Sequence, residues 1–511
     1  MRSFCLILAS LFLAAFCSNA VFARFDEEND LLLSSAQFSL QEYRNEAEKL
    51  ARWCDENGLL SHAKMTRDYI LPILPDCLHI PMIPRKKQRD LLPEEASPEI
   101  VYWHNNWMVL RQNLSLKLQE HAKQALHERR VILAMQMIHI ALHADPDNEK
   151  LRNVVGFEFY EGEWRTEWEI NQMKRGRVNH ERFGWIAARN IERYEAGERY
   201  DAKLKKWISK AEDDQRHATI ENGWVISTEH YDIQTNHSIE EGVRLSRHLE
   251  VFYYVWKQVF IQYTASTSEL AQWLDGQKAR YKEPRLKFVF FKNRRDYVEA
   301  LQKDDPIVEK SLGFYDEPTK TCYFFMYDVS NSEKDAEAEQ NMLRTVFHEG
   351  THQLFCCAKP VKYHARNNFW ATEAVAIYME TLRREGNYFV LGNPMDVRVL
   401  AAKYRFFESK FYMPFENIVK LDARTFQNAP YLKELYSQCG GMGYFLMHYD
   451  KGSYRDAFVT YLNEIYMGRT NPQTLFQLLG ESPDQLDSRY EKMLADIPVE
   501  FETESKNTGE K

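Results

Sequence analysis

The segment TVFHEGTHQLF, residues 345–355, constrains this chain more than any other stretch. No proline interrupts it, and Val346, Phe347, Leu354 and Phe355 give it an apolar flank at helical spacing. The segment therefore predicts an α-helix that packs one side against a core.

Two histidines and a glutamate in this predicted helix point to a metal. His348 and His352 stand four residues apart, so they project from the same face of the helix. Two imidazoles at this spacing can bind one zinc ion. Glu349 lies about 100° further round the helix, where it can reach a water at the metal without binding the metal itself. These residues fit hydrolysis, in which zinc lowers the pKa of a water and a carboxylate accepts its proton.

A catalytic zinc site normally has three protein ligands, so a third residue is required. A metzincin arrangement needs Gly and His where this chain has Phe355 and Ala358. No downstream Gly-Thr-x-x-Asp supplies an aspartate ligand. The arrangement that remains takes a glutamate from a second helix.

The segment NNFWATEAVAIYME, residues 367–380, supplies that glutamate as Glu373, with 20 residues between it and His352. Glu373 stands among apolar residues, where an unpaired carboxylate is costly and a metal would satisfy it. An ion pair with an arginine such as Arg366 is the alternative role for this carboxylate.

Three other candidates for the third ligand are His364, Glu380 and the pair Cys356-Cys357. His364 lies in a polar stretch typical of an exposed loop. Glu380 falls about two helical turns past Glu373, roughly 10 Å further along, so both cannot reach one ion. The two cysteines lie at or just beyond the end of the histidine helix. Glu373 is the predicted ligand.

The pattern H-E-x-x-H followed by W-x-x-E-x-x-A-x-Y, here Trp370 to Tyr378, resembles the gluzincin superfamily of zinc peptidases. The closer likeness, over residues 224–465, is to an exported bacterial family described as peptidase-MA-like and long classed as a domain of unknown function. The resemblance implies Zn²⁺ as the cofactor. It assigns the ligand role to His348, His352 and Glu373, and the general-base role to Glu349.

The resemblance has two departures and one further implication. Ala374 stands where gluzincins usually have Gly, and the Gly-x-Met-Glu-Asn element of the aminopeptidase branch is missing from the sequence, so aminopeptidase activity is not predicted. Gluzincins often bring a tyrosine from a later helix to the oxyanion. Tyr436 is our candidate for that role, with Tyr444 and Tyr449 as alternatives.

The chain begins with an apolar run that ends in small residues, at Ala20 and Ala23. This pattern predicts a cleaved signal peptide over residues 1–23 and a secreted or periplasmic protein. No later segment is long and apolar enough to span a bilayer. The net charge of −9 and the absence of a basic block make nucleic acid an unexpected partner.

The remaining sequence predicts an α+β protein. Residues 24–220 predict a helical N-terminal region without a fixed repeat, ending in a charged connecting helix over 189–220. Residues 221–498 predict a zincin-like domain with a small twisted sheet, the active-site helix and a helical C-terminal part. Its strands are expected at 224–236 and 286–291, and in a hairpin over 313–328 that turns at 317–320. Residues 499–511 predict a polar tail.

The sequence thus predicts an exported zinc-dependent hydrolase, best described as a metallopeptidase that acts on a polypeptide. A non-catalytic envelope interaction protein on a zincin-like scaffold is the alternative, and a hydrolase of non-peptide amides is a third reading. Six cysteines follow the predicted signal peptide, and either a Cys54–Cys77 disulfide or free thiols fit them.

Overall fold

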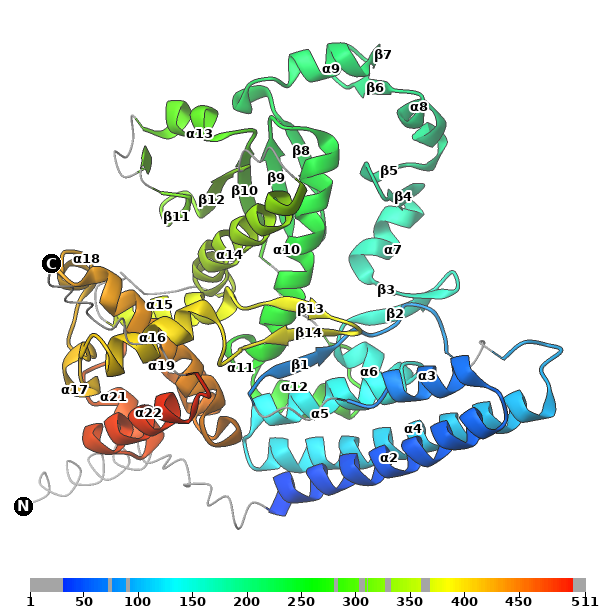
Figure 1. Ribbon diagram of the computed structural model, residues 1–511. Coiled ribbons are helices and arrows are strands. Elements are labelled where there is room, and N and C mark those ends of the chain that lie inside the picture. Colours follow the sequence, from blue (N-terminus) through cyan, green and yellow to red (C-terminus); the bar gives the residue numbers. More distant parts are fainter. Residues whose placement is uncertain are drawn as a thin grey trace, which may run out of the picture.

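The computed structural model describes most of the chain and has α+β architecture, as predicted (Figure 1). The predicted signal peptide and the tail beyond Val499 lie outside the described residues. The described residues are 31–71, 76–88, 92–279, 284–302, 308–309, 311–326, 332–359 and 368–499.

The N-terminal helices form a layer at the lower edge of Figure 1. The Ser97 side chain caps the longest of them, with a proline at the first helical position, and the Asn148 side chain caps the last. Two cores of buried, mainly apolar side chains join these helices, so the helical prediction is confirmed as far as Val154. The helices are α2 (Leu31–Glu56), α3 (Leu60–Asp68), α4 (Pro98–His127), α5 (Val131–Ala144) and α6 (Glu149–Val154).

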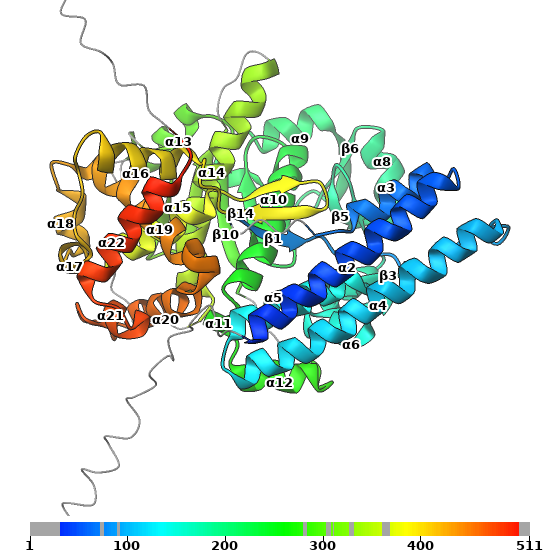
Figure 2. The same ribbon diagram turned by 60° about the horizontal axis from the view of Figure 1, so that its bottom comes forward.

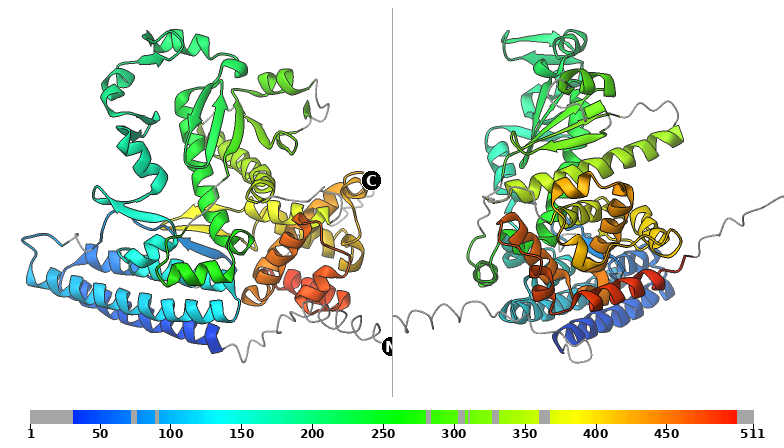
Figure 3. Two further views of the ribbon diagram at one scale, coloured as in Figure 1. Left: turned by 180° about the vertical axis from the view of Figure 1, so that it is seen from behind. Right: turned by 90° about the vertical axis from the view of Figure 1, so that its left-hand side faces the viewer.

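The next segment contradicts the prediction. Residues 157–216 form three successive units, each a two-stranded hairpin followed by a short helix, which we call the repeat arm. The arm arches from the base of the molecule to the top of its sheet (Figures 1 and 3). Its elements are β2 (Phe157–Tyr160), β3 (Glu163–Thr166), α7 (Glu167–Lys174), β4 (Arg177–His180), β5 (Gly184–Ala187), η3 (Ala188–Asn190), α8 (Ile191–Glu195), β6 (Glu198–Asp201), β7 (Lys206–Ser209) and α9 (Lys210–Arg216).

The repeat has a sequence signature that the prediction missed. Each second strand carries a tryptophan at its second position, and a glycine with positive φ precedes each first strand. These tryptophans and glycines are few and stand among charged residues. The composition of the segment is therefore similar to that of a solvent-exposed helix. The predicted connecting helix over 189–220 and the predicted lack of a repeat are therefore wrong. The tryptophans are Trp164, Trp185 and Trp207, and the glycines are Gly156, Gly176 and Gly197.

A five-stranded sheet follows the arm, in the order β11-β12-β10-β9-β8. Strands β9, β10 and β12 are parallel, and β8 and β11 run antiparallel at the two edges. The strand predicted at 224–236 is in fact two paired strands, whereas the strand at 286–291 and the turn at 317–320 are confirmed. The strands are β8 (Trp224–Ser227), β9 (Tyr231–Thr235), β10 (Leu286–Phe291), β11 (Gly313–Asp316) and β12 (Thr321–Phe325).

Helices connect and cover this sheet. The Ser238 side chain accepts a hydrogen bond from the Glu241 amide and caps α10. Short helices η4 (Ile220–Asn222), α11 (Ile261–Thr264), α12 (Thr267–Leu274) and α13 (Arg294–Leu301) accompany the long helices α10 (Ile239–Val259) and α14 (Ser332–Cys357).

The C-terminal part is mainly helical, as predicted, and it shares packing with the N-terminal layer. Strand β1 (Leu78–Pro81) pairs antiparallel with β14 (Tyr388–Leu391), so one sheet takes strands from both ends of the chain. Ile132 of α5 belongs to the same core as α14 and α15. The elements are α15 (Phe369–Met379), β13 (Arg383–Glu385), β14, α16 (Val397–Phe407), α17 (Phe415–Ile418), α18 (Ala423–Gln427), α19 (Leu432–Gly452), α20 (Arg455–Tyr466), α21 (Thr474–Leu479) and α22 (Pro483–Asp496).

Two further predictions concern membranes and disulfides. Within the described ranges, every helix is too short or too polar to cross a membrane. Each of the six cysteines after the predicted signal peptide is a free thiol, so the Cys54–Cys77 pairing does not form.

Candidate metal centre

Helix α14 presents the H-E-x-x-H residues from a fixed position. Val346 and Leu354 are fully buried, and the Phe347 ring stacks on Phe252 of α10 with centroids 4.9 Å apart. This packing holds one side of α14 in the core and leaves His348 and His352 partly exposed on the other.

Helix α15 brings Glu373 to the same place. Its residues from Trp370 to Met379 are all buried, so it is surrounded by protein on every side. Helix α19 approaches closely because it has a glycine at the contact: a Cβ on Gly443 would lie 2.4 Å from the carbonyl oxygen of Ala374. The backbone of Ala374, the residue next to Glu373, is therefore in close contact with α19 at Gly443.

The three predicted ligands converge. The Nε2 atom of His348 lies 3.2 Å from Oε2 of Glu373, and the Nε2 atom of His352 lies 3.4 Å from Oε1. Glu373 is only 3% exposed. Its Oε2 accepts no hydrogen bond from the described residues. A buried carboxylate oxygen without a donor is costly unless a cation satisfies it.

The spacing matches a metal. Ligand atoms about 2.0–2.1 Å from one tetrahedral zinc lie about 3.3 Å apart. Within the described residues, His348, His352 and Glu373 are the one group of three such side chains whose ligand atoms all lie within 4.8 Å of one another. Two imidazoles and a carboxylate at this spacing could hold one metal ion, and zinc accepts all three ligand types.

Electrostatics in the site favours positive charge between these side chains. Burial acts to raise the pKa of Glu373, but His352 and His348 outweigh it and hold the pKa below its usual range. Burial acts to lower the pKa of His348, but the neighbouring carboxylates of Glu373 and Glu380 raise it well above its usual value. The two carboxylates beside His348 would therefore favour a divalent cation in the same place.

Glu349 is oriented by the sheet. Its Oε2 accepts a hydrogen bond of 3.0 Å from the backbone N–H of Tyr315, in the edge strand β11. Burial raises the pKa of Glu349, although the two histidines oppose the shift. A raised carboxylate pKa makes this residue a better proton acceptor, which suits a general base.

A second carboxylate lies behind the ligands. Glu380 was predicted to be too far away to share an ion with Glu373, and it is not in the ligand group. Its Oε1 instead lies 2.9 Å from Nδ1 of His348, and Arg344 and Arg398 each lie 3.2 Å from its Oε2. Arg344 also pairs with Asp396 at 2.8 Å. Sequence reasoning missed this network, although Arg344 precedes His348 by one helical turn.

Tyr436, on α19, is placed near the site. Burial, followed by the negative charges of Glu373 and Glu349, raises its pKa. The alternatives lie elsewhere: the Tyr444 ring stacks on His448 with centroids 4.8 Å apart, and Tyr449 stacks on Tyr454 at 5.3 Å. Tyr436 is therefore the tyrosine of the three that the two carboxylates influence.

The two rival cysteines do not join the group. Cys356 and Cys357 end α14, and the hydroxyl of Tyr315 lies 4.0 Å from Sγ of Cys357. His364 and Arg366 lie outside the described residues.

Comparison of the sequence with models of known protein families gives no match, and comparison with curated proteins gives none either. The site is therefore interpreted from its own residues.

Proposed function

We propose that this chain is an exported zinc-dependent hydrolase, a gluzincin-like metallopeptidase whose zincin-like domain spans residues 221–498. The observation that carries the proposal is the convergence of two Nε2 atoms on a buried carboxylate, at 3.2 and 3.4 Å, with Glu349 beside them. Bound zinc would supply Lewis-acid chemistry by polarising a carbonyl and acidifying a water.

The residues of the chain have separate roles in this proposal. Glu349 accepts the proton of the attacking water and returns it to the leaving amine. Tyr436 donates a hydrogen bond to the oxygen that becomes negative as the carbonyl is attacked. Glu380 accepts a hydrogen bond from Nδ1 of His348, which leaves Nε2 free to bind the metal. Together these roles describe hydrolysis of a peptide bond in a polypeptide substrate.

The test combines metal analysis with activity. Purified protein without residues 1–23 should contain one zinc per chain, and His348→Ala, His352→Ala and Glu373→Ala should each lose it. Glu349→Gln should retain zinc but hydrolyse a mixed peptide library about 10²–10⁴-fold more slowly, because an amide cannot accept the proton. Glu385→Gln, at an exposed glutamate of β13, is the matched control.

The outcomes separate the alternatives. Zinc binding without hydrolysis of any peptide would favour the non-catalytic envelope protein, and hydrolysis of non-peptide amides alone would favour the third reading. Full zinc content in all three ligand variants would overturn the proposed site.

A further inference from the structure

Helix α15 reaches the surface one turn away from the proposed ligand Glu373. Every residue from Trp370 to Met379 is buried, whereas Phe369, the first residue of the helix, is partly exposed. Phe369 precedes Glu373 by four residues, so the two side chains lie on the same side of α15. The side of the helix that carries the ligand therefore ends at a partly exposed aromatic ring.

A buried ring connects Phe369 with Tyr436, and we call Phe369, Phe426 and Tyr436 the aromatic wall. Phe426 of α18 lies edge to face with Phe369, with ring centroids 5.3 Å apart, and with Tyr436 of α19 at 5.6 Å. Phe426 is fully buried, whereas the other two residues are partly exposed. Helices α15, α18 and α19 lie together on the left of Figure 2, so three separate helices build this wall.

The aromatic wall adjoins the candidate metal centre at Tyr436. Burial raises the pKa of Tyr436, and the nearby carboxylates of Glu373 and Glu349 add to this rise. The side chains of His348 and His352 are 15% and 17% exposed, so a ligand can reach the centre. A carbonyl held between the metal and the Tyr436 hydroxyl therefore has the rings of the wall beside it.

We propose that the aromatic wall selects the substrate, so that this site cleaves next to an aromatic or large aliphatic side chain packed on Phe369 and Tyr436. The inference rests on the proposed function, because the bound carbonyl places that side chain. Aromatic rings gain from edge-to-face contact with one another in addition to the gain from apolar burial. A charged side chain would lose its hydration against these rings without gaining a partner, so the wall disfavours it.

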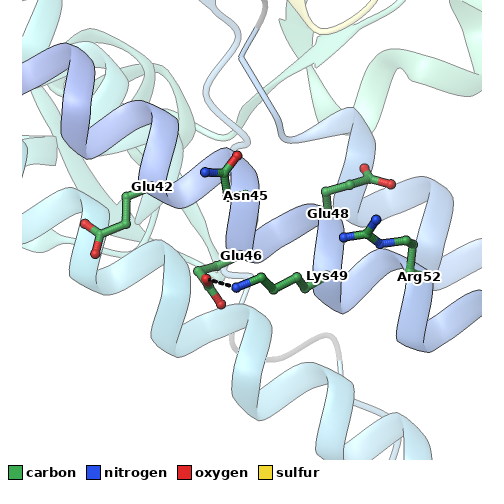
Figure 4. A pocket seen from close by; sticks show the side chains of 6 residues that line it. All are labelled: Glu42, Asn45, Glu46, Glu48, Lys49 and Arg52. Atoms are coloured by element: carbon green, nitrogen blue, oxygen red, sulfur yellow. Dashed lines mark hydrogen bonds and ion pairs between the residues drawn. The ribbon is translucent and has the colours of Figure 1, made fainter.

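A groove on α2 provides a control region of opposite character. Its lining is polar, and Lys49 and Glu46 form an ion pair of 2.6 Å within it (Figure 4). Phe38 is 70% exposed and lies one turn before the groove on the same helix. Replacing Phe38 therefore removes an exposed aromatic ring without changing the aromatic wall. The groove is lined by Glu42, Asn45, Glu46, Glu48, Lys49 and Arg52.

Binding of small hydroxamates to the zinc-loaded protein tests the inference without turnover. The hydroxamate group chelates zinc, so its substituent reports on the neighbouring surface. Phenylacetohydroxamate should bind about tenfold more tightly than acetohydroxamate. Succinic monohydroxamate, which carries a carboxylate, should bind no more tightly than acetohydroxamate. Calorimetry on protein without residues 1–23 measures the three affinities.

Variants of Phe369 connect this preference to the aromatic wall. Phe369→Ala should retain zinc and reduce the preference for the phenyl compound about three- to tenfold, because an aromatic contact is lost. Phe369→Leu, which keeps an apolar side chain, should reduce the preference by less, and Phe38→Ala should leave it unchanged. A phenyl compound that binds the parent no more tightly than the methyl compound, or an unaltered preference in both Phe369 variants, would overturn the inference alone. A parent that binds no zinc would overturn the proposed function as well.

The cleavage products of the mixed peptide library give a second measurement. Sequencing of the product ends should show aromatic and large aliphatic residues enriched at a position next to the cut. Phe369→Ala should lose the enrichment of aromatic residues, whereas Phe38→Ala should retain it. Cuts without apolar enrichment at either neighbouring position would also overturn the inference, although hydrolysis itself would still support the proposed function.

Discussion

Glu373 and Glu380 are buried carboxylates that contact opposite nitrogens of His348. The contacts of His348 with Glu373 and with Glu380 have different roles. Glu373 completes the ligand group, whereas Glu380 holds the ring in one orientation and is itself held by two arginines. Glu380, which is outside the candidate ligand group, can therefore control how well the proposed metal binds.

We predict that Glu380→Gln weakens zinc binding about 10–100-fold, because the amide is a poorer acceptor for the His348 N–H and leaves two arginines without their carboxylate. Competition with a zinc chelator measures the change, and Glu385→Gln serves again as the control. Unaltered affinity would mean that the ring orientation does not depend on this contact. This effect follows from the contact between His348 and Glu380, which the sequence did not indicate.

We also predict that Tyr436→Phe lowers kcat by about 10²-fold with little change in KM, since an oxyanion donor acts mainly in the transition state. Steady-state kinetics on any cleaved peptide measures both constants. Tyr444→Phe should retain the parental kcat, because that ring packs against His448. The reverse pattern would assign the role to Tyr444.

At the scale of elements, the site depends on how closely helices approach. Helix α14 carries three of the functional residues, but α15 and α19 decide where Glu373 and Tyr436 lie. The contact of Gly443 with Ala374 fixes α15 against α19 at the residue next to Glu373.

We predict that Gly443→Ala destabilises the protein by about 1–3 kcal/mol, the usual cost of overpacking. Helix propensity alone predicts the opposite sign, a gain of about 1 kcal/mol, because alanine favours a helix over glycine. Urea denaturation distinguishes the two. Zinc affinity should fall as well, because the added Cβ pushes α15 away. A more stable variant would show that α15 and α19 are not in close contact.

For the whole molecule, the shared cores make stability depend on the buried helix α5. His139 and His143 are buried in this helix, and neither ring nitrogen of either residue is hydrogen-bonded within the described residues. Burial lowers the pKa of each to about 3, with a smaller contribution from Arg111 at His143. The unfolded chain therefore binds protons at these histidines that the folded protein excludes.

We predict that acid destabilises the fold. Above the unfolded pKa of about 6.5, neither histidine reduces the free energy of unfolding. By pH 5 each histidine reduces it by about 2 kcal/mol, because the unfolded chain binds a proton that the folded protein excludes. Urea denaturation at pH 7 and pH 5 measures the loss. His139→Leu should reduce the loss by about 2 kcal/mol, whereas His127→Leu, at the exposed end of α4, should not. Equal losses in the parent and His139→Leu would contradict the prediction.

The sequence by itself determined the features that depend on short-range geometry. Helical periodicity placed His348, Glu349 and His352 on one helix, because their relation needs only the pitch of an α-helix. Apolar composition around Glu373 identified a carboxylate that needs a partner. The turn after Asp316 and the strand at 286–291 followed from local preferences in the same way.

Only the tertiary structure decided which distant parts of the chain lie side by side. These contacts join residues far apart in the sequence, and no pattern of neighbouring residues predicts them. Glu380 reaches His348 because α14 and α15 cross, and helical pitch along α15 gives no information about that crossing. The β1–β14 pair joins residues 78–81 to residues 388–391 through backbone hydrogen bonds. The repeat arm was hidden because its few tryptophans and glycines stand among charged residues, and the pairing of short strands depends on neighbours that composition does not reveal.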